Sequence, residues 1–188
     1  MDTSEIGNVG EEAVREVLRD IKGDLISGFI RSSNIVYYGK NFQLDFLVFV
    51  PKIGLVVLEV KKWKGTIAAT SEVKWTQKFG EYGNEYQNAS LQVLRTSGLL
   101  LQILEKGNIN KWPIRPVVVF AHENAKILRA KAPFAPQTDI ILKSMIPSWL
   151  ENNANDEVFY KFKKCEFERV KQIIQEFTSE YVENTSQI

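Results

Sequence analysis

Cysteine and histidine are almost absent from this sequence of 188 residues, which contains one of each, Cys165 and His122. A single cysteine cannot form a disulfide within the chain and suits a reducing compartment, so we expect a cytoplasmic protein. Without clusters of Cys and His, a zinc centre is disfavoured. Nothing in the sequence supports a Ser-His or Cys-His nucleophile.

Long hydrophobic runs and an excess of one charge are also lacking. The longest nearly apolar stretch, 46–60, is rich in valine and is interrupted by Pro51-Lys52, so it indicates two strands and no membrane span. The N-terminus has no basic region followed by an apolar run, so we expect no secretory signal. The formal net charge of +1 gives no global sign of nucleic-acid binding. Five lysines against one acid between Lys61 and Lys78 could face phosphates, although such a run is more often a solvated surface.

What is present indicates one α/β domain. The length suits a single hydrophobic core, so we expect residues 1–188 to form one domain. Apolar spacing predicts helices at 4–21, 85–106, 146–150 and around 167–181, strong strands at 42–50, 55–61 and 117–121, and weaker ones at 26–31, 34–38 and 139–142, with a small hairpin at 66–69 and 73–76. This order predicts an α/β sandwich with a mixed sheet.

Three charged residues interrupt the two strongest strands. Asp45, Glu59 and Lys61 each lie in a segment that otherwise has the composition of a buried strand. Such residues are rarely buried unless they are paired or bind a metal. Glu59 and Lys61 are two apart and therefore project from the same face of one strand. A structural ion-pair cluster is the alternative interpretation.

The face on which Asp45 lies depends on the connecting turn. If Gly54 takes a left-handed conformation in a three-residue loop, Pro51 pairs with Leu55 and Asp45 lies opposite Lys61. All three charged side chains then converge on one face. A two-residue loop would place Asp45 on the other face.

The residue types suit chemistry on phosphate esters. Two carboxylates leave room around a magnesium ion for water and substrate oxygens, and the ion lowers the pKa of a bound water. A lysine beside them can orient that water or stabilise charge on the phosphorus. Glu11 is a fourth candidate, because it shares a helical stripe with Val14 and Leu18 at the border of the packed face. Its alternative role is a first-turn acid favoured by the helix dipole.

Four segments together resemble the NERD (nuclease-related) domain family, which is assigned to the PD-(D/E)xK nuclease superfamily. They are Gly7-Asn8-Val9-Gly10-Glu11-Glu12, Gln43-Leu44-Asp45, Glu59-Val60-Lys61-Lys62-Trp63-Lys64-Gly65, and Trp75. The resemblance implies a restriction-endonuclease-like α-β-β-β-α-β sandwich with a central mixed sheet and an added C-terminal helix. It places the nuclease core at 7–121 and makes 122–188 a C-terminal elaboration.

The resemblance also implies roles for individual residues. Metal ligation falls to Asp45, Glu59 and the backbone carbonyl of Val60, with Mg²⁺ as the ion and Mn²⁺ as a substitute. Lys61 becomes the catalytic lysine, Glu11 an accessory acid, and Gln87 a polar helix residue of the site. Two departures are that Leu44 replaces the proline of the superfamily name and that no Asn-Pro precedes Gln87.

Two classes of function follow. The first is a metal-dependent nuclease that hydrolyses phosphodiester bonds, with DNA favoured over RNA as substrate. The second is a non-catalytic module that keeps the fold and binds nucleic acid or protein. Hydrolysis of another phosphate ester is a weaker third option. Two carboxylates retained together with Lys61 favour the nuclease, because a module that only binds has no use for a buried lysine beside two acids.

Overall fold

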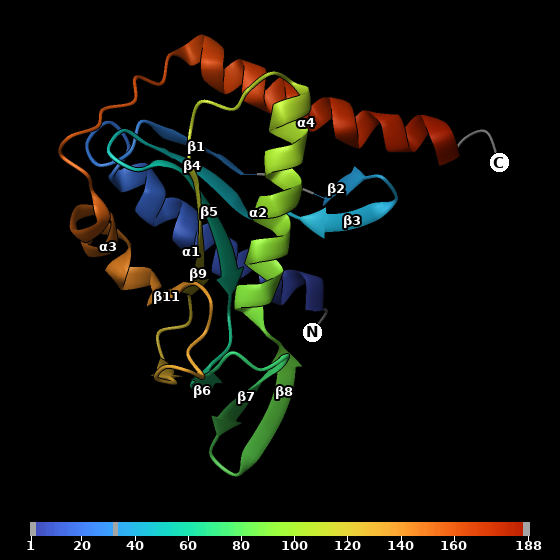
Figure 1. The fold of residues 1–188 in the computed structure, drawn as a ribbon. Helices are drawn as coiled ribbons and strands as arrows, with labels where there is room; N and C mark the ends of the chain where they lie inside the picture. The colour runs from blue at the N-terminus through green and yellow to red at the C-terminus, as the bar shows by residue number, and fades with distance from the viewer. Residues whose placement is uncertain (1–2, 32–33, 186–188) are drawn as a thin grey trace.

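The computed structural model describes residues 3–31 and 34–185. The elements follow one another along the chain as α1 (Thr3–Asp20), β1 (Gly28–Arg31), β2 (Asn34–Tyr37), β3 (Lys40–Gln43), β4 (Phe46–Val50), β5 (Gly54–Lys61), β6 (Gly65–Ala69), β7 (Lys74–Phe79), β8 (Tyr82–Gln87), α2 (Ala89–Lys106), β9 (Ile114–Phe120), β10 (Ala125–Arg129), β11 (Asp139–Leu142), a 3-10 turn (Lys143–Met145), α3 (Ile146–Asn153) and α4 (Lys164–Thr185). The predicted mixed α/β class is confirmed (Figure 1).

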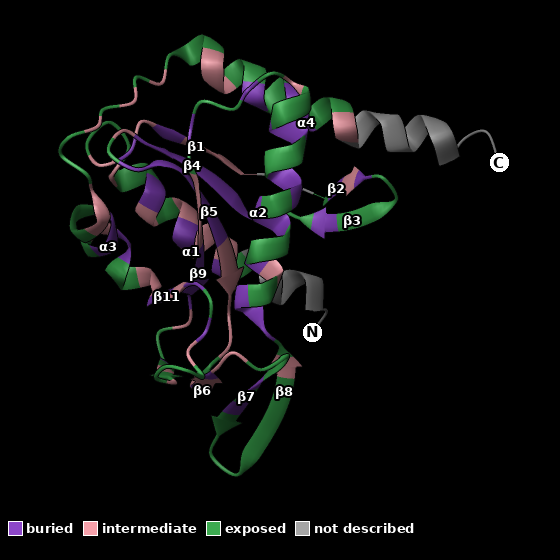
Figure 2. Cartoon of the chain, in the orientation of Figure 1, coloured by how far each residue is buried: buried purple, intermediate pink, exposed green. Residues whose placement is uncertain are grey.

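A five-stranded mixed sheet in the order β1-β4-β5-β9-β11 forms the centre of the molecule. β1, β4 and β5 are antiparallel neighbours, whereas β9 runs parallel to β5 and β11 parallel to β9. β4 is buried along its whole length, as the valine-rich sequence predicts for a strand covered on both faces (Figure 2). The sequence prediction that segments 42–50 and 55–61 are adjacent and antiparallel is therefore confirmed for their paired parts.

Helices cover both faces of this sheet. On one face, Val14 and Leu18 of α1 and Trp149 of α3 pack against the even-numbered residues of β4 and β5. On the other face, α2 and α4 pack against the odd-numbered residues, which include Phe49 and Val57. The alternation of side chains along each strand produces this division. Every odd-numbered side chain of β5 therefore points toward the α2 layer.

The turn between β4 and β5 has the left-handed glycine that the sequence predicts, but the register differs by two residues. Gly54 has a φ of 112° and pairs with Val50. β4 begins only at Phe46, which pairs with Leu58, so Asp45 has no partner in this ladder and the predicted pairing with Lys61 is wrong. A shift of two residues preserves the face of every side chain.

A second sheet, in the order β10-β6-β7-β8, forms a separate lobe at one end of the main sheet (Figure 1). The sequence predicts β6 and part of β7 but misses β8 and β10. It also starts the helix after β8 too early, at residue 85. Asn88 is the helix N-cap, because its side chain accepts a hydrogen bond from the backbone N–H of Leu91. Among the described residues, no helix is long and apolar enough to cross a membrane.

Candidate active site

Asp45 lies at a break between two strands. The sequence predicts a continuous strand over 42–50, but β3 ends at Gln43 and β4 begins at Phe46. β4 therefore stops pairing with β5 at Leu58, and the last residues of β5 lose their antiparallel neighbour. Asp45 takes the place of that neighbour, because its Oδ2 accepts a hydrogen bond of 2.7 Å from the backbone N–H of Val60.

The backbone of Val60 presents two polar groups on this side. The carbonyl of Lys61 accepts a hydrogen bond from the backbone N–H of Ala121, just beyond the end of β9. The backbone N–H and C=O of Lys61 therefore point toward β9. Successive strand residues alternate in the direction of these groups, and a residue's N–H and C=O point to the same side. The carbonyl of Val60 therefore points to the same side as its N–H, which is bonded to Asp45.

Glu59 and Lys61 lie beside Asp45 on the α2 face of the sheet. Lys61 Nζ forms an ion pair of 2.8 Å with Glu59 Oε1, and both side chains are largely buried, with 20% and 12% of their surface exposed. The structure thus brings together the three charged residues that the sequence singles out.

The charge of this cluster acts most strongly on Asp45, which is only 5% exposed. The pKa of Asp45 is raised to about 7 by burial and by the nearby charges of Glu59 and Glu11. The hydrogen bond from Val60 and the charge of Lys61 oppose this rise. Desolvation is the largest of these causes, followed by Glu59. The Val60 hydrogen bond and Lys61 therefore compensate the charge of ionised Asp45 only in part, and an added cation would supply the rest.

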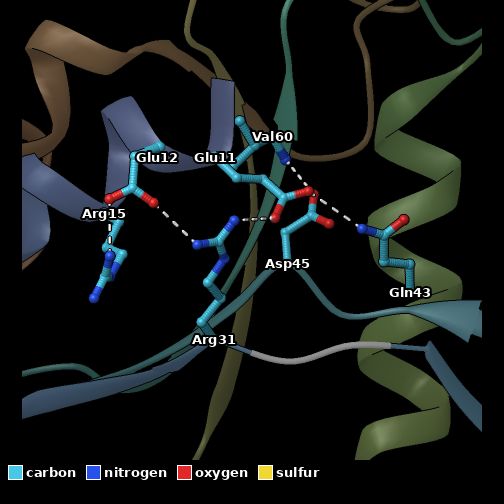
Figure 3. A network of polar contacts seen from close by, with 7 residues as sticks. All are labelled: Glu11, Glu12, Arg15, Arg31, Gln43, Asp45 and Val60. Carbon is cyan, nitrogen blue, oxygen red and sulfur yellow. Dashed lines mark hydrogen bonds and ion pairs between the residues drawn. The ribbon is translucent and has the colours of Figure 1, made fainter. Parts of the chain in front are cut away.

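Glu11 reaches the site from the opposite layer. Gly10 allows α1 to approach the end of β5 closely, because a Cβ there would lie 3.1 Å from Cβ of Lys62. Figure 3 shows the carboxylate of Glu11 beside that of Asp45, whose pKa the charge of Glu11 helps to raise. The helix position predicted from the sequence is therefore correct for Glu11.

Two residues that the sequence analysis does not single out as site residues hold Glu11 in this position. Arg31, at the end of β1, donates to Glu11 Oε2 at 3.2 Å and also to Glu12 at 3.1 Å. Gln43, at the end of β3, donates to Glu11 Oε1 at 3.2 Å (Figure 3). No local pattern announces these contacts, because the partners lie 20 and 32 residues from Glu11 in the sequence.

Gln87 does not occupy the predicted helical position. It is the last residue of β8, pairs with Lys74 and is exposed, because the helix begins only after Asn88. Asn88 was the available signal for the start of the helix, since asparagine is a favoured N-cap. Gln92, in the first turns of α2, has a side-chain Oε1 that is buried and has no hydrogen-bond partner.

The arrangement offers oxygen ligands of the kind that Mg²⁺ prefers. Asp45, Glu59 and the Val60 carbonyl could hold such an ion, and the uncompensated charge on Asp45 fits that use. Within residues 3–31 and 34–185, no group of three or more His, Cys, Asp or Glu side chains is arranged to hold a metal. Two carboxylates and one carbonyl would leave the remaining positions to water and substrate.

Comparison with known proteins identified a family for this chain. The family model described as NERD, nuclease-related domain, matches residues 6–121, which is more than half of the chain. This segment contains most of α1, the break at Asp45, β5 and α2. No match was found among curated proteins or among solved structures.

Proposed function

The chain belongs to the nuclease-related domain family, and on that premise we propose that it is a metal-dependent nuclease that hydrolyses phosphodiester bonds, with DNA as the favoured substrate. The observation that carries the proposal is the pair of carboxylates on Asp45 and Glu59, which are close enough for the charge of Glu59 to raise the pKa of Asp45, with Lys61 ion-paired to Glu59. The core order α1, β1, β4, β5, α2, β9 supports the restriction-endonuclease-like sandwich that the sequence predicts.

The proposed ligands for Mg²⁺ or Mn²⁺ are Asp45, Glu59 and the carbonyl of Val60. A bound ion would neutralise phosphate charge and make its water a better nucleophile. The carboxylate of Asp45 is fixed by the N–H of Val60, so it needs little reorganisation to bind a ligand. Glu11, held by Arg31, stands behind Asp45 as an accessory acid that can hold water.

Lys61 has a separate role in this proposal. Its ammonium group lies 2.8 Å from Glu59, so it is held next to the carboxylates without being a ligand. It can donate hydrogen bonds to the attacking water and to a phosphoryl oxygen as negative charge develops there. Its burial strengthens these interactions, because the effective dielectric is lower than in water.

A cleavage assay tests the proposal directly. Purified protein is incubated with plasmid DNA, single-stranded DNA and RNA, each with Mg²⁺, Mn²⁺ or EDTA. We expect cleavage with either metal and none in EDTA. If no substrate is cleaved with any metal, the nuclease proposal fails, and the non-catalytic binding module becomes the better interpretation.

Two neighbouring lysines provide a matched pair of variants. Lys61→Met should reduce the cleavage rate by about 10²–10³-fold, the usual cost of losing one such electrostatic contact. Lys62 projects to the other face and packs against Gly10, so Lys62→Met keeps this apolar packing and should retain most activity. If Lys62→Met is inactive and Lys61→Met is active, the assignment of the catalytic lysine is wrong.

A further inference from the structure

The hairpin formed by β7 and β8 extends away from the main sheet and is largely exposed toward its tip (Figures 1 and 2). Tyr82, Asn84 and Tyr86 are alternate residues of β8 and therefore lie on one face of the hairpin. Phe79, Gln77 and Trp75 of β7 pair with Tyr82, Asn84 and Tyr86 and lie on this same face. Trp75 and Gln77 are buried, so the accessible part of the face consists of Phe79 and the three residues of β8.

This face is continuous with the candidate active site. Lys61 Nζ lies 5.8 Å from the ring centre of Trp63. Trp63 stacks on Tyr86, with ring centres 4.3 Å apart and planes inclined by 16°. Tyr82 and Tyr86 are four positions apart on β8, a distance of about 13 Å at the usual rise per residue. We call Trp63, Tyr86, Tyr82 and Phe79 the aromatic face.

The hairpin is held firmly in this orientation. Gln77 donates to the carbonyl of Lys64 at 2.6 Å, and Asn84 donates to Gln77 at 3.3 Å. Lys64 Nζ lies 4.2 Å from the ring centre of Phe79, which places a positive charge beside the aromatic face. These contacts connect the hairpin to the segment that follows Lys61.

Core packing accounts for the inner part of the aromatic face but not for its outer part. Trp63 packs against the core with Phe120, whereas Tyr82 is 80% exposed and Phe79 44% exposed. Tyr82 is the most exposed of the large hydrophobic side chains of the described residues. An exposed tyrosine, a half-exposed phenylalanine and a lysine next to a site for phosphate chemistry match the elements that bind unpaired nucleotides.

We propose that the aromatic face binds a single-stranded stretch of nucleic acid and directs it to the site at Lys61. Bases stack on Tyr82 and on the exposed edge of the Trp63–Tyr86 pair, while Lys64 contacts the phosphate backbone. The proposal rests on the proposed function, because the bound strand is the substrate of that site.

Stacking on these rings requires an unpaired base. In a duplex, the faces of the bases are covered by their neighbours, whereas single strands can place each base on an aromatic side chain. The proposal therefore predicts a preference for single-stranded over blunt duplex substrate. It also predicts that the bases matter, and that phosphates alone bind weakly.

Binding in EDTA tests this surface without cleavage. The probe is a short fluorescein-labelled oligothymidylate, compared with the same strand annealed to its complement and with an abasic strand of equal length. Fluorescence anisotropy should show the tightest binding for the oligothymidylate. Tyr82→Ala should weaken it by about fivefold or more, the usual cost of one lost stack, whereas Tyr82→Phe should retain it.

Two further variants complete the design. Phe159 is also exposed, at 66%, and lies near Pro51 at the C-terminal end of β4, whereas the candidate active site lies at the N-terminal end of that strand. Phe159→Ala should therefore leave binding unchanged. Lys64→Gln should lower the slope of log affinity against log salt by about 0.7, as expected for one phosphate contact to a single strand.

The outcomes separate this inference from the proposed function. Equal binding of duplex, abasic and single-stranded probes, or a Tyr82→Ala variant that behaves like Phe159→Ala, would overturn the aromatic face as a binding surface even if the protein cleaves DNA. Binding that depends on Tyr82, in a protein that cleaves no substrate with any metal, would support the surface and refute the nuclease. Absence of binding by every probe would refute the surface.

Discussion

The charge of Asp45 should destabilise the apoprotein, and the variant Asp45→Asn should measure by how much. The amide oxygen of an asparagine can still accept the hydrogen bond from Val60, which is 2.7 Å long in the structure. The variant therefore removes the negative charge while keeping the backbone contact. We expect Asp45→Asn to be more stable than wild type at about pH 8 in EDTA, because the carboxyl group of Asp45 is then ionised in the folded protein.

The magnitude follows from the pKa of Asp45, which rises from 3.8 to about 7 in the folded protein. At about 1.4 kcal/mol per unit, the ionised carboxylate costs up to about 4 kcal/mol of folding free energy. Burying the amide of the variant costs about 1–2 kcal/mol if one N–H lacks an acceptor. We therefore expect a net stabilisation of about 2–3 kcal/mol, or about 5–10 °C in Tm for a chain of this size.

The sign depends on pH. Below the unfolded pKa of 3.8, Asp45 is protonated in both states and carries no penalty. As the pH rises toward 7, the unfolded state ionises first, so the wild-type protein progressively loses this part of its stability. Above about pH 7 the loss is complete. The advantage of Asp45→Asn should thus be absent at about pH 4 and full at about pH 8.

Urea and thermal unfolding across this pH range measure the effect. Asp156 provides the control, because it is exposed and its pKa is lowered by a hydrogen bond from Lys52. Asp156→Asn should therefore bring no stabilisation at high pH. If Asp45→Asn is no more stable than wild type at about pH 8, or equally more stable at about pH 4, the electrostatic reasoning about the site is refuted.

Three other predictions concern the metal, a turn and a buried amide. Mg²⁺ or Mn²⁺ at about 100 times its Kd should stabilise the wild type by about 2.7 kcal/mol. In thermal unfolding, the rise in Tm should be reversed by EDTA and should be smaller in Glu59→Gln. An equal rise in both proteins would count against the metal site. Gly54→Ala should destabilise the fold by more than about 1 kcal/mol in urea unfolding, because φ is 112° and a Cβ would lie 2.7 Å from the carbonyl oxygen of Pro113. Its control is Gly98→Ala in α2, where a Cβ meets nothing within 4 Å, and this variant should stabilise the fold by about 0.5–1 kcal/mol. Gln92→Leu should leave the free energy of unfolding unchanged or raise it, since Oε1 of Gln92 has no hydrogen-bond partner. The variant should also slow cleavage if this amide contributes to the active site, whereas unchanged cleavage kinetics would show that it does not.

The sequence predicts the centre of the site well because strand alternation is robust. Glu59 and Lys61 share a face whatever the pairing, and any even shift of register leaves Asp45 on that face as well. The register itself depends on the detailed geometry of the turn at Gly54, which composition does not determine. Asp45 itself lies outside the paired part of β4 and accepts a hydrogen bond from Val60 across the break, so the predicted pairing with Lys61 is wrong.

The second lobe could not be predicted as completely. β8 has the sequence Tyr-Gly-Asn-Glu-Tyr-Gln and lacks the alternation of apolar and polar residues that marks a half-buried strand. Its strand conformation comes from pairing with β7, a tertiary effect that outweighs local preference. The predicted helical position of Gln87 is wrong for this reason, because residues 85–87 belong to β8 and α2 begins only after Asn88.

The break between β3 and β4 gives position 45 a dual role with an evolutionary consequence. The side chain there substitutes for a missing strand by accepting the N–H of Val60, and it also carries the charge assigned to metal binding. Selection for folding alone requires only an acceptor at this position, whereas the proposed metal binding would also require the carboxylate. In a descendant that had lost the proposed hydrolysis, we therefore expect asparagine to be tolerated in place of Asp45, while a fully apolar residue stays rare.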